Sequence, residues 1–211
     1  MNECKAIRDA LLNRREDLMS LLLRTRRLAQ DTGNNRVRDW AEHELNGYPQ
    51  HQALPEYREI PAQSFVKLQG NQLVIESIRF PTEFIPDELQ EELGVSRLFN
   101  PVADYLPYLQ GKYKDELCEV WYRDQLAQIN EAQRFMPGMV CLAGWKAIQR
   151  SAICEMVASC RDELLFGLSE IEFGLGQRAP ASVSSAYTSK HNMLMVAISG
   201  GVTQQAQRQS A

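Results

Sequence analysis

Apolar residues recur at helical spacing near both ends of the chain. Between residues 4 and 31 they fall close to every 3.6 residues, at Ile7, Leu11, Leu18, Leu21, Leu22 and Leu28. A stripe of this kind predicts one long amphipathic helix, which Asp31-Thr32-Gly33-Asn34 ends. The pattern from 34 to 46 predicts a second helix, antiparallel to the first because the link is short. The clearest stripe runs from 150 to 173, and Gly174 and Gly176 are predicted to end that helix.

The middle of the chain changes to the spacing of strands. The runs 64–68 and 73–78 flank Gly70-Asn71 and predict a β-hairpin, and 139–145 predicts a short strand that joins its sheet. Residues 87–93 predict a short helix with acidic residues in its first turn, and two prolines make 98–113 a turn or a broken helix. Residues 114–134 predict a helix with Leu117, Val120 and Trp121 inward, and a strand over 117–122 is the alternative.

These elements together predict an α+β fold, mostly helical. Long amphipathic helices would pack on a small antiparallel sheet and cover one of its faces. We expect one domain over residues 1–176, a linker rich in Ser, Ala and Pro over 177–190, and an apolar strand with a polar tail over 191–211.

The apolar run near the C-terminus has no neighbour along the chain with which to pair. A bare strand invites strand addition, so it is predicted to pair with a second copy or a partner protein. The alternative is that it folds back as one more strand of its own sheet. The predicted assembly residues are Met193, Leu194, Met195, Val196, Ile198, Gly200 and Gly201.

Composition and charge narrow the class of protein. A hydrophobic content of 44% and a net charge of −4 are those of a soluble globular protein, without the positive field that recruits nucleic acid or anionic membrane. No apolar run approaches the roughly 18 residues of a membrane span, and no signal peptide is recognised, so a cytoplasmic protein is expected. Five cysteines without a Cys-x2-Cys pair predict buried or half-buried free thiols. With three scattered histidines, neither a metal site nor a cofactor is expected.

The candidate site residues gather around the end of the second helix. A carboxylate and a guanidinium, Glu44 and Arg58, are predicted to form a bidentate contact that pins the following loop to the helix, a role favoured over catalysis. Arg161 interrupts the stripe of the late helix; it either extends to the surface or binds a carboxylate such as Glu44 or Glu172. The candidate binding residues are Trp40, Glu44, Tyr48, Tyr57, Arg58 and Arg161.

Three blocks of this sequence resemble those of one protein family, the AbiTii domain. The first two are Trp40-x3-Glu44-Leu45-x-Gly47-Tyr48-Pro49 with Leu54-Pro55-x-Tyr57-Arg58, and Val157-x3-Arg161-x2-Leu164-Leu165-x6-Glu172. The third is the apolar tail from Asn192 to Val202. The resemblance implies a bacterial module linked to abortive infection and anti-phage defence. It implies a context rather than a reaction, because the family carries no agreed biochemical activity.

No complete catalytic motif is present in the sequence. Glu42-His43-Glu44 lacks the second histidine of a metalloprotease helix, and there is neither a P-loop nor a Gly-x-Ser-x-Gly elbow. The sequence therefore favours a non-catalytic sensor, adaptor or oligomerisation module that assembles with itself or with a defence partner. Two alternatives stay open: a nuclease or RNase toxin, and a regulatory domain with a small-ligand pocket lined by Trp40, Tyr48 and Tyr57. The arginines of the first helix leave nucleic-acid binding open, but interleaved acidic residues favour a solvated face.

Overall fold

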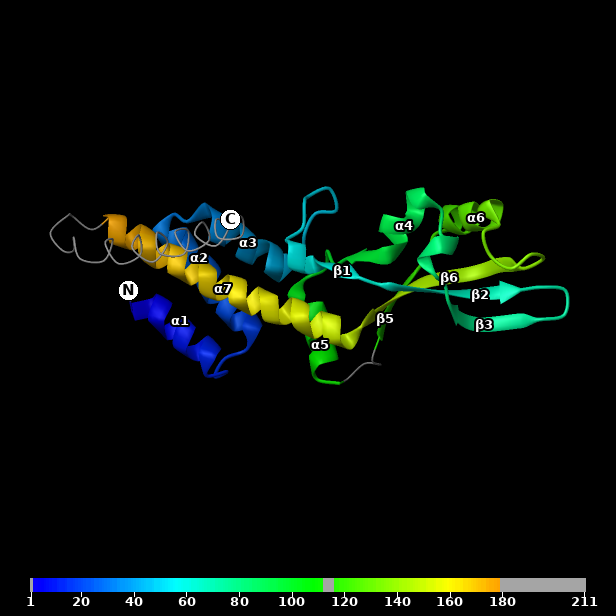
Figure 1. Ribbon diagram of the computed structural model, residues 1–211. Coiled ribbons are helices and arrows are strands. Elements are labelled where there is room, and N and C mark those ends of the chain that lie inside the picture. Colours follow the sequence, from blue (N-terminus) through cyan, green and yellow to red (C-terminus); the bar gives the residue numbers. More distant parts are fainter. Residues whose placement is uncertain (1, 112–115, 179–211) are drawn as a thin grey trace, which may run out of the picture. The chain divides into compact units, whose positions relative to one another are not determined.

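The structure is a computed structural model that describes residues 2–111 and 116–178. Contacts divide the chain into two compact units, of which the first is Met1–Glu172 and the second is Phe173–Ala211. The helices of the first unit are α1 (Asn2–Leu12), α2 (Leu18–Thr32), α3 (Asn35–Asn46), α4 (Asp87–Gly94), α5 (Leu106–Leu109), α6 (Arg123–Ala132) and α7 (Arg150–Arg178), which runs on into the second unit (Figure 1). The strands are β1 (Glu59–Pro61), β2 (Gln63–Gln69), β3 (Val74–Arg79), β4 (Val95–Arg97), β5 (Glu116–Val120) and β6 (Val140–Gln149). Three short 3-10 turns are η1 (Glu56–Arg58), η2 (Thr82–Phe84) and η3 (Val102–Asp104). The predicted fold class, α+β and mostly helical, is confirmed.

The prediction of one helix over residues 4–31 is wrong, because the chain breaks between α1 and α2. Arg14 has a positive φ of 51°, which a helix does not accommodate. Asp17 then caps α2 by accepting a hydrogen bond from the Ser20 backbone N–H at 2.9 Å. The break lets α1 fold back and pack against α2.

Helix α3 has the predicted bounds, whereas α7 is longer than predicted. Asn34 caps α3 by accepting from the Val37 N–H at 3.1 Å, and Gly47 follows its end. Helix α7 continues through Gly174 and Gly176, so the predicted end there is wrong. A glycine inside a helix costs only about 1 kcal/mol relative to alanine, which a long helix tolerates.

The strands form an antiparallel four-stranded sheet, in the order β3-β2-β6-β5, and a separate pair, β1-β4. The predicted hairpin is β2-β3, and the predicted strand near 142 is β6, which joins that sheet as expected. Residues 117–120 form β5, so the favoured helix is wrong there and the strand alternative holds. Val120 is accordingly 74% exposed rather than inward, although Trp121 is buried as predicted. Pairing of Val120 with Trp145 on β6 decides the conformation that local preference left open.

The inner face of the sheet is covered by short helices, not by the long ones. The core on this face is a cluster of buried residues that includes Trp121 and to which β2, β6, α4 and α6 contribute. Trp121 lies on Gly144, where a Cβ atom would come within 1.9 Å of the indole ring. The expectation that the long helices cover the sheet is therefore wrong. Their apolar stripes face one another: α2 packs on α1 and α3, and Val37 of α3 contacts α7 at Gly167.

Two further expectations concern cysteines and membrane spans. Cys4, Cys141 and Cys160 are buried and Cys154 is half-buried, as predicted, but Cys118 is exposed because it lies on the edge strand β5. Within residues 2–111 and 116–178, no helix combines the length and the apolar character that crossing a membrane requires.

Candidate functional site

Helix α3 carries a carboxylate into the core. Its buried residues, Val37, Trp40, Ala41, Glu44 and Leu45, follow helical spacing, so Glu44 occupies a position where an apolar residue is usual. The chain then turns at Gly47, whose φ of 91° and ψ of 163° favour glycine. A Cβ atom at Gly47 would lie 2.9 Å from the Phe99 carbonyl oxygen. This turn directs the following loop back towards η1, which holds Tyr57 and Arg58.

Arg58 forms the bidentate contact with Glu44 that the sequence predicted. Its Nε donates to Glu44 Oε1 at 3.0 Å and its Nη2 to Oε2 at 2.6 Å, and both side chains are 0% exposed. Its Nη1 donates to the carbonyl oxygens of Leu98 and Asn100, each at 2.7 Å. The guanidinium also lies over the Tyr48 ring, 4.8 Å from the centroid. Arg58 therefore joins α3, η1 and the segment after β4.

Two tyrosines and a thiol complete the shell around the carboxylate. Tyr48 and Tyr57 donate their hydroxyl protons to Glu44 Oε1 at 2.8 and 2.7 Å, and the Cys160 thiol on α7 donates to Oε2 at 3.4 Å. Trp40 Nε1 in turn donates to the Tyr57 hydroxyl at 2.8 Å. The Glu44 carboxylate thus accepts hydrogen bonds from four side chains. We call Trp40, Glu44, Tyr48, Tyr57, Arg58 and Cys160 the buried cluster.

Burial and the charge of Glu44 keep the donors of this cluster protonated. Burial first, and then the negative charge of Glu44, raise the pKa of Tyr48 and of Tyr57 above the ordinary value of 10. The same two causes raise the pKa of the Cys160 thiol well above 9. Burial opposes the charge of Arg58, but the hydrogen bonds and charge of Glu44 outweigh it, and the pKa of Arg58 lies above its ordinary value. At neutral pH neither the tyrosines nor the thiol are poised to act as base or nucleophile.

The structure gathers five of the six candidate binding residues and leaves Arg161 outside. Arg161 is half-buried on α7, and the two carboxylates considered for it bind other guanidiniums: Glu44 binds Arg58 and Glu172 binds Arg8 at 2.7 Å. The polar atoms of the three aromatic residues form hydrogen bonds within the cluster: Trp40 with Tyr57, and both tyrosines with Glu44. Whether these residues bind a ligand stays a prediction.

A groove of about 520 Å³ adjoins the cluster at Tyr57. It is lined by Glu56, Tyr57, Ser159, Asp162, Glu163 and Phe166, from η1 and α7. Tyr57 is thus the member of the cluster that also faces a hollow on the surface.

Sequence reasoning missed Cys160 as a member of the cluster, and it missed the two carbonyl partners of Arg58. Cys160 belongs to the buried stripe that predicted α7, so its burial was readable from the sequence. Its contact with Glu44 joins residues 116 positions apart and left no local signal. In residues 2–111 and 116–178, no three His, Cys, Asp or Glu side chains lie close enough to hold a metal ion.

The predicted tail lies outside the described residues. Gln177 and Arg178, the first described positions after the predicted domain, belong to α7 rather than to a linker. The remaining linker and the assembly residues, Met193 to Ile198 with Gly200 and Gly201, are outside residues 2–111 and 116–178. Their predicted role in assembly stays a prediction.

The fold and the site define an α+β domain with a buried carboxylate–guanidinium cluster. This cluster ties helix α3 to the segments around β1 and β4. This chain belongs to the AbiTii family, whose model matches residues 4–196. The resemblance to this family is thereby confirmed: the first two sequence blocks lie within the matched residues, and the third, Asn192 to Val202, lies only partly within them. Neither the curated proteins nor the solved structures include a significant match to the chain.

Proposed function

We propose that this protein is a non-catalytic sensor or adaptor of a bacterial abortive-infection system that acts against phage. The family supplies the context, because its name refers to abortive infection. The observation that carries the non-catalytic part is the state of Glu44. Both of its oxygens accept hydrogen bonds, from the buried Tyr48 and Arg58 and from the half-buried Tyr57, and the side chain is 0% exposed.

A nuclease toxin requires an acid or base that reaches its substrate. A general base lies within hydrogen-bond distance of the proton that it removes. Glu44 is enclosed by its own donors, so it fits that role poorly. His43, the neighbouring candidate, is half-buried and lies with its ring against Tyr48, with centroids 5.0 Å apart. These contacts favour a structural role for the end of α3, so partner proteins are expected to bind at other surfaces.

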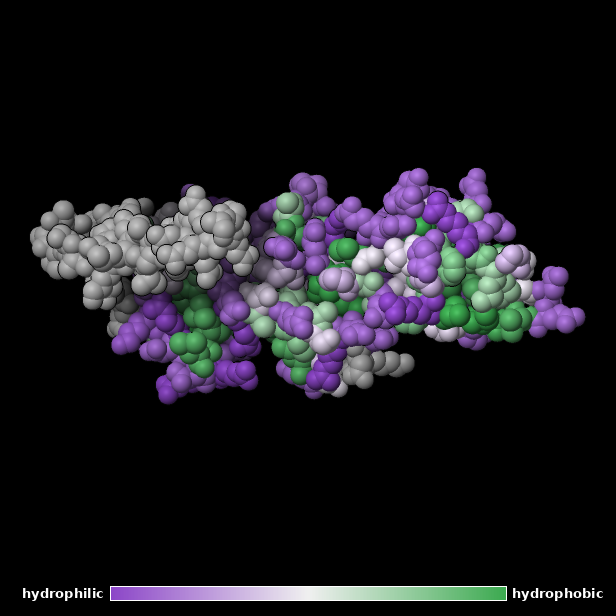
Figure 2. Space-filling view, in the orientation of Figure 1, coloured by the Kyte–Doolittle hydropathy of each residue, from purple (hydrophilic) through white to green (hydrophobic). Residues whose placement is uncertain are grey.

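An exposed apolar patch at one end of the sheet supports a role in protein binding. Val74 and Val140 face Gln69 from the two strands that flank β2, and they are 48% and 49% exposed. Leu73, which precedes Val74, and Leu142, two residues after Val140 on β6, are exposed to a similar degree. Figure 2 shows hydrophobic residues gathered over this end of the β2-β3 hairpin. Clustered apolar side chains at a surface are typical of contacts with other proteins. We call Leu73, Val74, Val140 and Leu142 the apolar tip.

The proposed partner is a second copy of this chain or another protein of the same defence system. The apolar tip is one contact surface, and the segment from Met193 to Ile198 is the second, by strand addition. Two separate contacts on one chain raise the strength of an assembly through effective concentration.

The first experiment separates the proposal from a toxin. Expression of the isolated chain should leave bacterial growth unchanged, and the purified chain should leave RNA and DNA intact in the presence of Mg²⁺ or Mn²⁺. The variants His43→Ala and Tyr57→Phe keep the buried ion pair and serve as probes of chemistry. Cleavage that either variant abolishes, with circular dichroism and melting temperature unchanged, would show that the protein is an enzyme.

The second experiment tests the apolar tip. Val74→Lys and Val140→Lys should weaken self-association in light scattering, or capture of the proteins encoded beside this one, and should weaken protection in a phage plating assay. Gln72→Lys is the matched control, because it adds the same charge at an exposed polar position of the same turn. The tip has no role in assembly if all three variants behave like the unchanged protein in all three measurements.

A further inference from the structure

A second hollow lies at the other end of the hairpin, away from the apolar tip. It has a volume of about 340 Å³ and is lined by the start of β2, the end of β3, η2 and the last residue of α4. Three hydrogen bonds hold its wall together: Ser64 Oγ to the Leu93 carbonyl at 2.9 Å, Ala62 N–H to the Gly94 carbonyl at 2.8 Å, and Phe80 N–H to the Ser64 carbonyl at 2.8 Å. The hollow is therefore formed by packed elements rather than by one loose loop. Its volume falls within the range of small-molecule sites.

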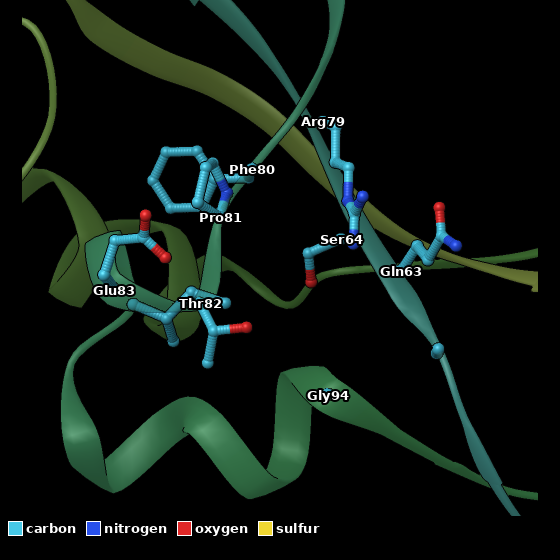
Figure 3. Close-up of a pocket in the computed structure, with 10 residues that line it drawn as sticks. Gln63, Ser64, Arg79, Phe80, Pro81, Thr82, Glu83 and Gly94 are labelled. Carbon is cyan, nitrogen blue, oxygen red and sulfur yellow. The ribbon is translucent and has the colours of Figure 1, made fainter.

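Opposite charges stand on two sides of this hollow. Figure 3 shows the Arg79 side chain beside Ser64 on one side, and the Glu83 carboxylate beyond Thr82 on the other. The hydroxyls of Ser64 and Thr82 lie between them, and Gly94 closes the side formed by the helix. A Cβ atom at Gly94 would meet nothing within 4 Å, so the space beside it is open.

Three polar side chains of the hollow are not engaged with the rest of the protein, whereas the Ser64 hydroxyl donates to the Leu93 carbonyl. Within residues 2–111 and 116–178, the side chains of Arg79, Thr82 and Glu83 take part in no hydrogen bond or ion pair. Several other arginines of the domain, such as Arg24, Arg36 and Arg97, bind two carboxylates each. Beside these polar groups lie the apolar residues Phe80, Pro81 and Ile85.

We propose that this hollow binds a small molecule with an acidic group at one end and a hydrogen-bond donor at the other. The acidic group, a phosphate or a carboxylate, is held by Arg79, because a guanidinium donates two parallel hydrogen bonds to either. The donor, an amine or a hydroxyl, is held by Glu83. The Thr82 hydroxyl contacts the middle of the ligand, as does the Ser64 oxygen, which accepts because its proton is donated to the Leu93 carbonyl. The carbon skeleton of the ligand lies against Pro81 and Ile85. This site is separate from the proposed protein contacts, and its test is independent of them.

Two probes distinguish the two sources of the acidic group. Adenosine 5′-monophosphate carries a phosphate with hydroxyl and amine donors, and glutamine carries a carboxylate with an amine. Binding to the full chain is measured by calorimetry and by chemical-shift changes of amides 62–64, 79–83 and 94. Inorganic phosphate and adenosine each supply one half of the proposed recognition and should bind more weakly than the monophosphate.

The variants assign the contacts within the site. Arg79→Gln should weaken binding of the preferred probe about tenfold or more, since a hydrogen bond to a charged group contributes at least that factor. Glu83→Gln should weaken the intact probe but leave inorganic phosphate unchanged. Arg123→Gln is the matched control, because Arg123 is exposed at the start of α6, distant in sequence from the hollow. Arg79 and Glu83 are both exposed, so their variants should keep the melting temperature.

Each outcome decides the proposal. Shifts confined to the hollow, with loss in Arg79→Gln and none in Arg123→Gln, support it, and the stronger probe identifies phosphate or carboxylate as the acidic group. The proposal is overturned if neither probe binds at millimolar concentration, if the shifts lie elsewhere, or if Arg79→Gln binds as well as the unchanged protein.

Discussion

Replacing both members of the buried ion pair tests whether Glu44 and Arg58 are an isolated pair or the centre of a larger cluster. In the single variants Glu44→Leu and Arg58→Met, one charge stays buried without its partner. The expected cost is roughly 3–5 kcal/mol each, because both side chains are 0% exposed. The double variant removes both charges, and for an isolated pair such a replacement is often close to neutral.

The surroundings of this pair predict a different result for the double variant. Five further polar groups lose a partner: the hydroxyls of Tyr48 and Tyr57, the Cys160 thiol, and the carbonyl oxygens of Leu98 and Asn100. The Tyr48 hydroxyl and the Leu98 carbonyl are buried, and a buried polar group left unpaired costs about 1–3 kcal/mol, so the double variant should remain destabilised by at least about 2 kcal/mol. That is an appreciable part of the roughly 5–15 kcal/mol by which a domain is usually stable.

Urea denaturation followed by circular dichroism measures these free energies of unfolding. The exposed pair of Arg26 and Glu42, at 2.7 Å with side chains 35% and 48% exposed, is the matched control. Replacing both of its members by alanine should change stability by about 0–1 kcal/mol. The reasoning is refuted if Glu44→Leu with Arg58→Met is as stable as the unchanged protein.

Three further predictions follow from single features. Gly47→Ala should cost about 1–3 kcal/mol in urea denaturation, because φ at that position is 91° and the new methyl group would lie 2.9 Å from the Phe99 carbonyl oxygen; an unchanged midpoint contradicts this. Because the pKa values of Tyr48 and Tyr57 are raised in the folded protein by burial and by Glu44, the folded state holds these protons more tightly than the unfolded one. Stability is therefore complete below pH 10 and falls as the pH rises above it, less steeply in Tyr57→Phe; equal slopes would show that the hydroxyl is not involved. Cys118 is exposed on its strand, so a thiol reagent should modify it first in the native protein, and mass spectrometry of the early product identifies the site.

The sequence predicted those elements and contacts that depend on residues close to one another in the chain. The stripe of α3, the glycine after its end and the pairing of Glu44 with Arg58 all follow from helix spacing and complementary chemistry within a short segment. The break before α2 also had a local signal, an aspartate directly before an apolar stripe, although the longer stripe concealed it. Contacts between residues far apart in the sequence could not be predicted from it. Strand β5 depends on its pairing with β6, and the hollow at Arg79 depends on the return of the chain at Gly94.

The contacts of α7 have a consequence for how the chain is made. Arg8 binds Glu172 across 164 positions of sequence, and Cys160 contacts Glu44 across 116. During synthesis, the first three helices and the carboxylate of Glu44 leave the ribosome long before the helix that completes their burial. Contacts of such long range slow folding, because the chain must close large loops before it gains from them. Helices α1, α2, α3 and α7 are therefore expected to pack together only near the end of translation. A chain that stops before α7 should be a substrate for chaperones and proteases rather than a folded fragment.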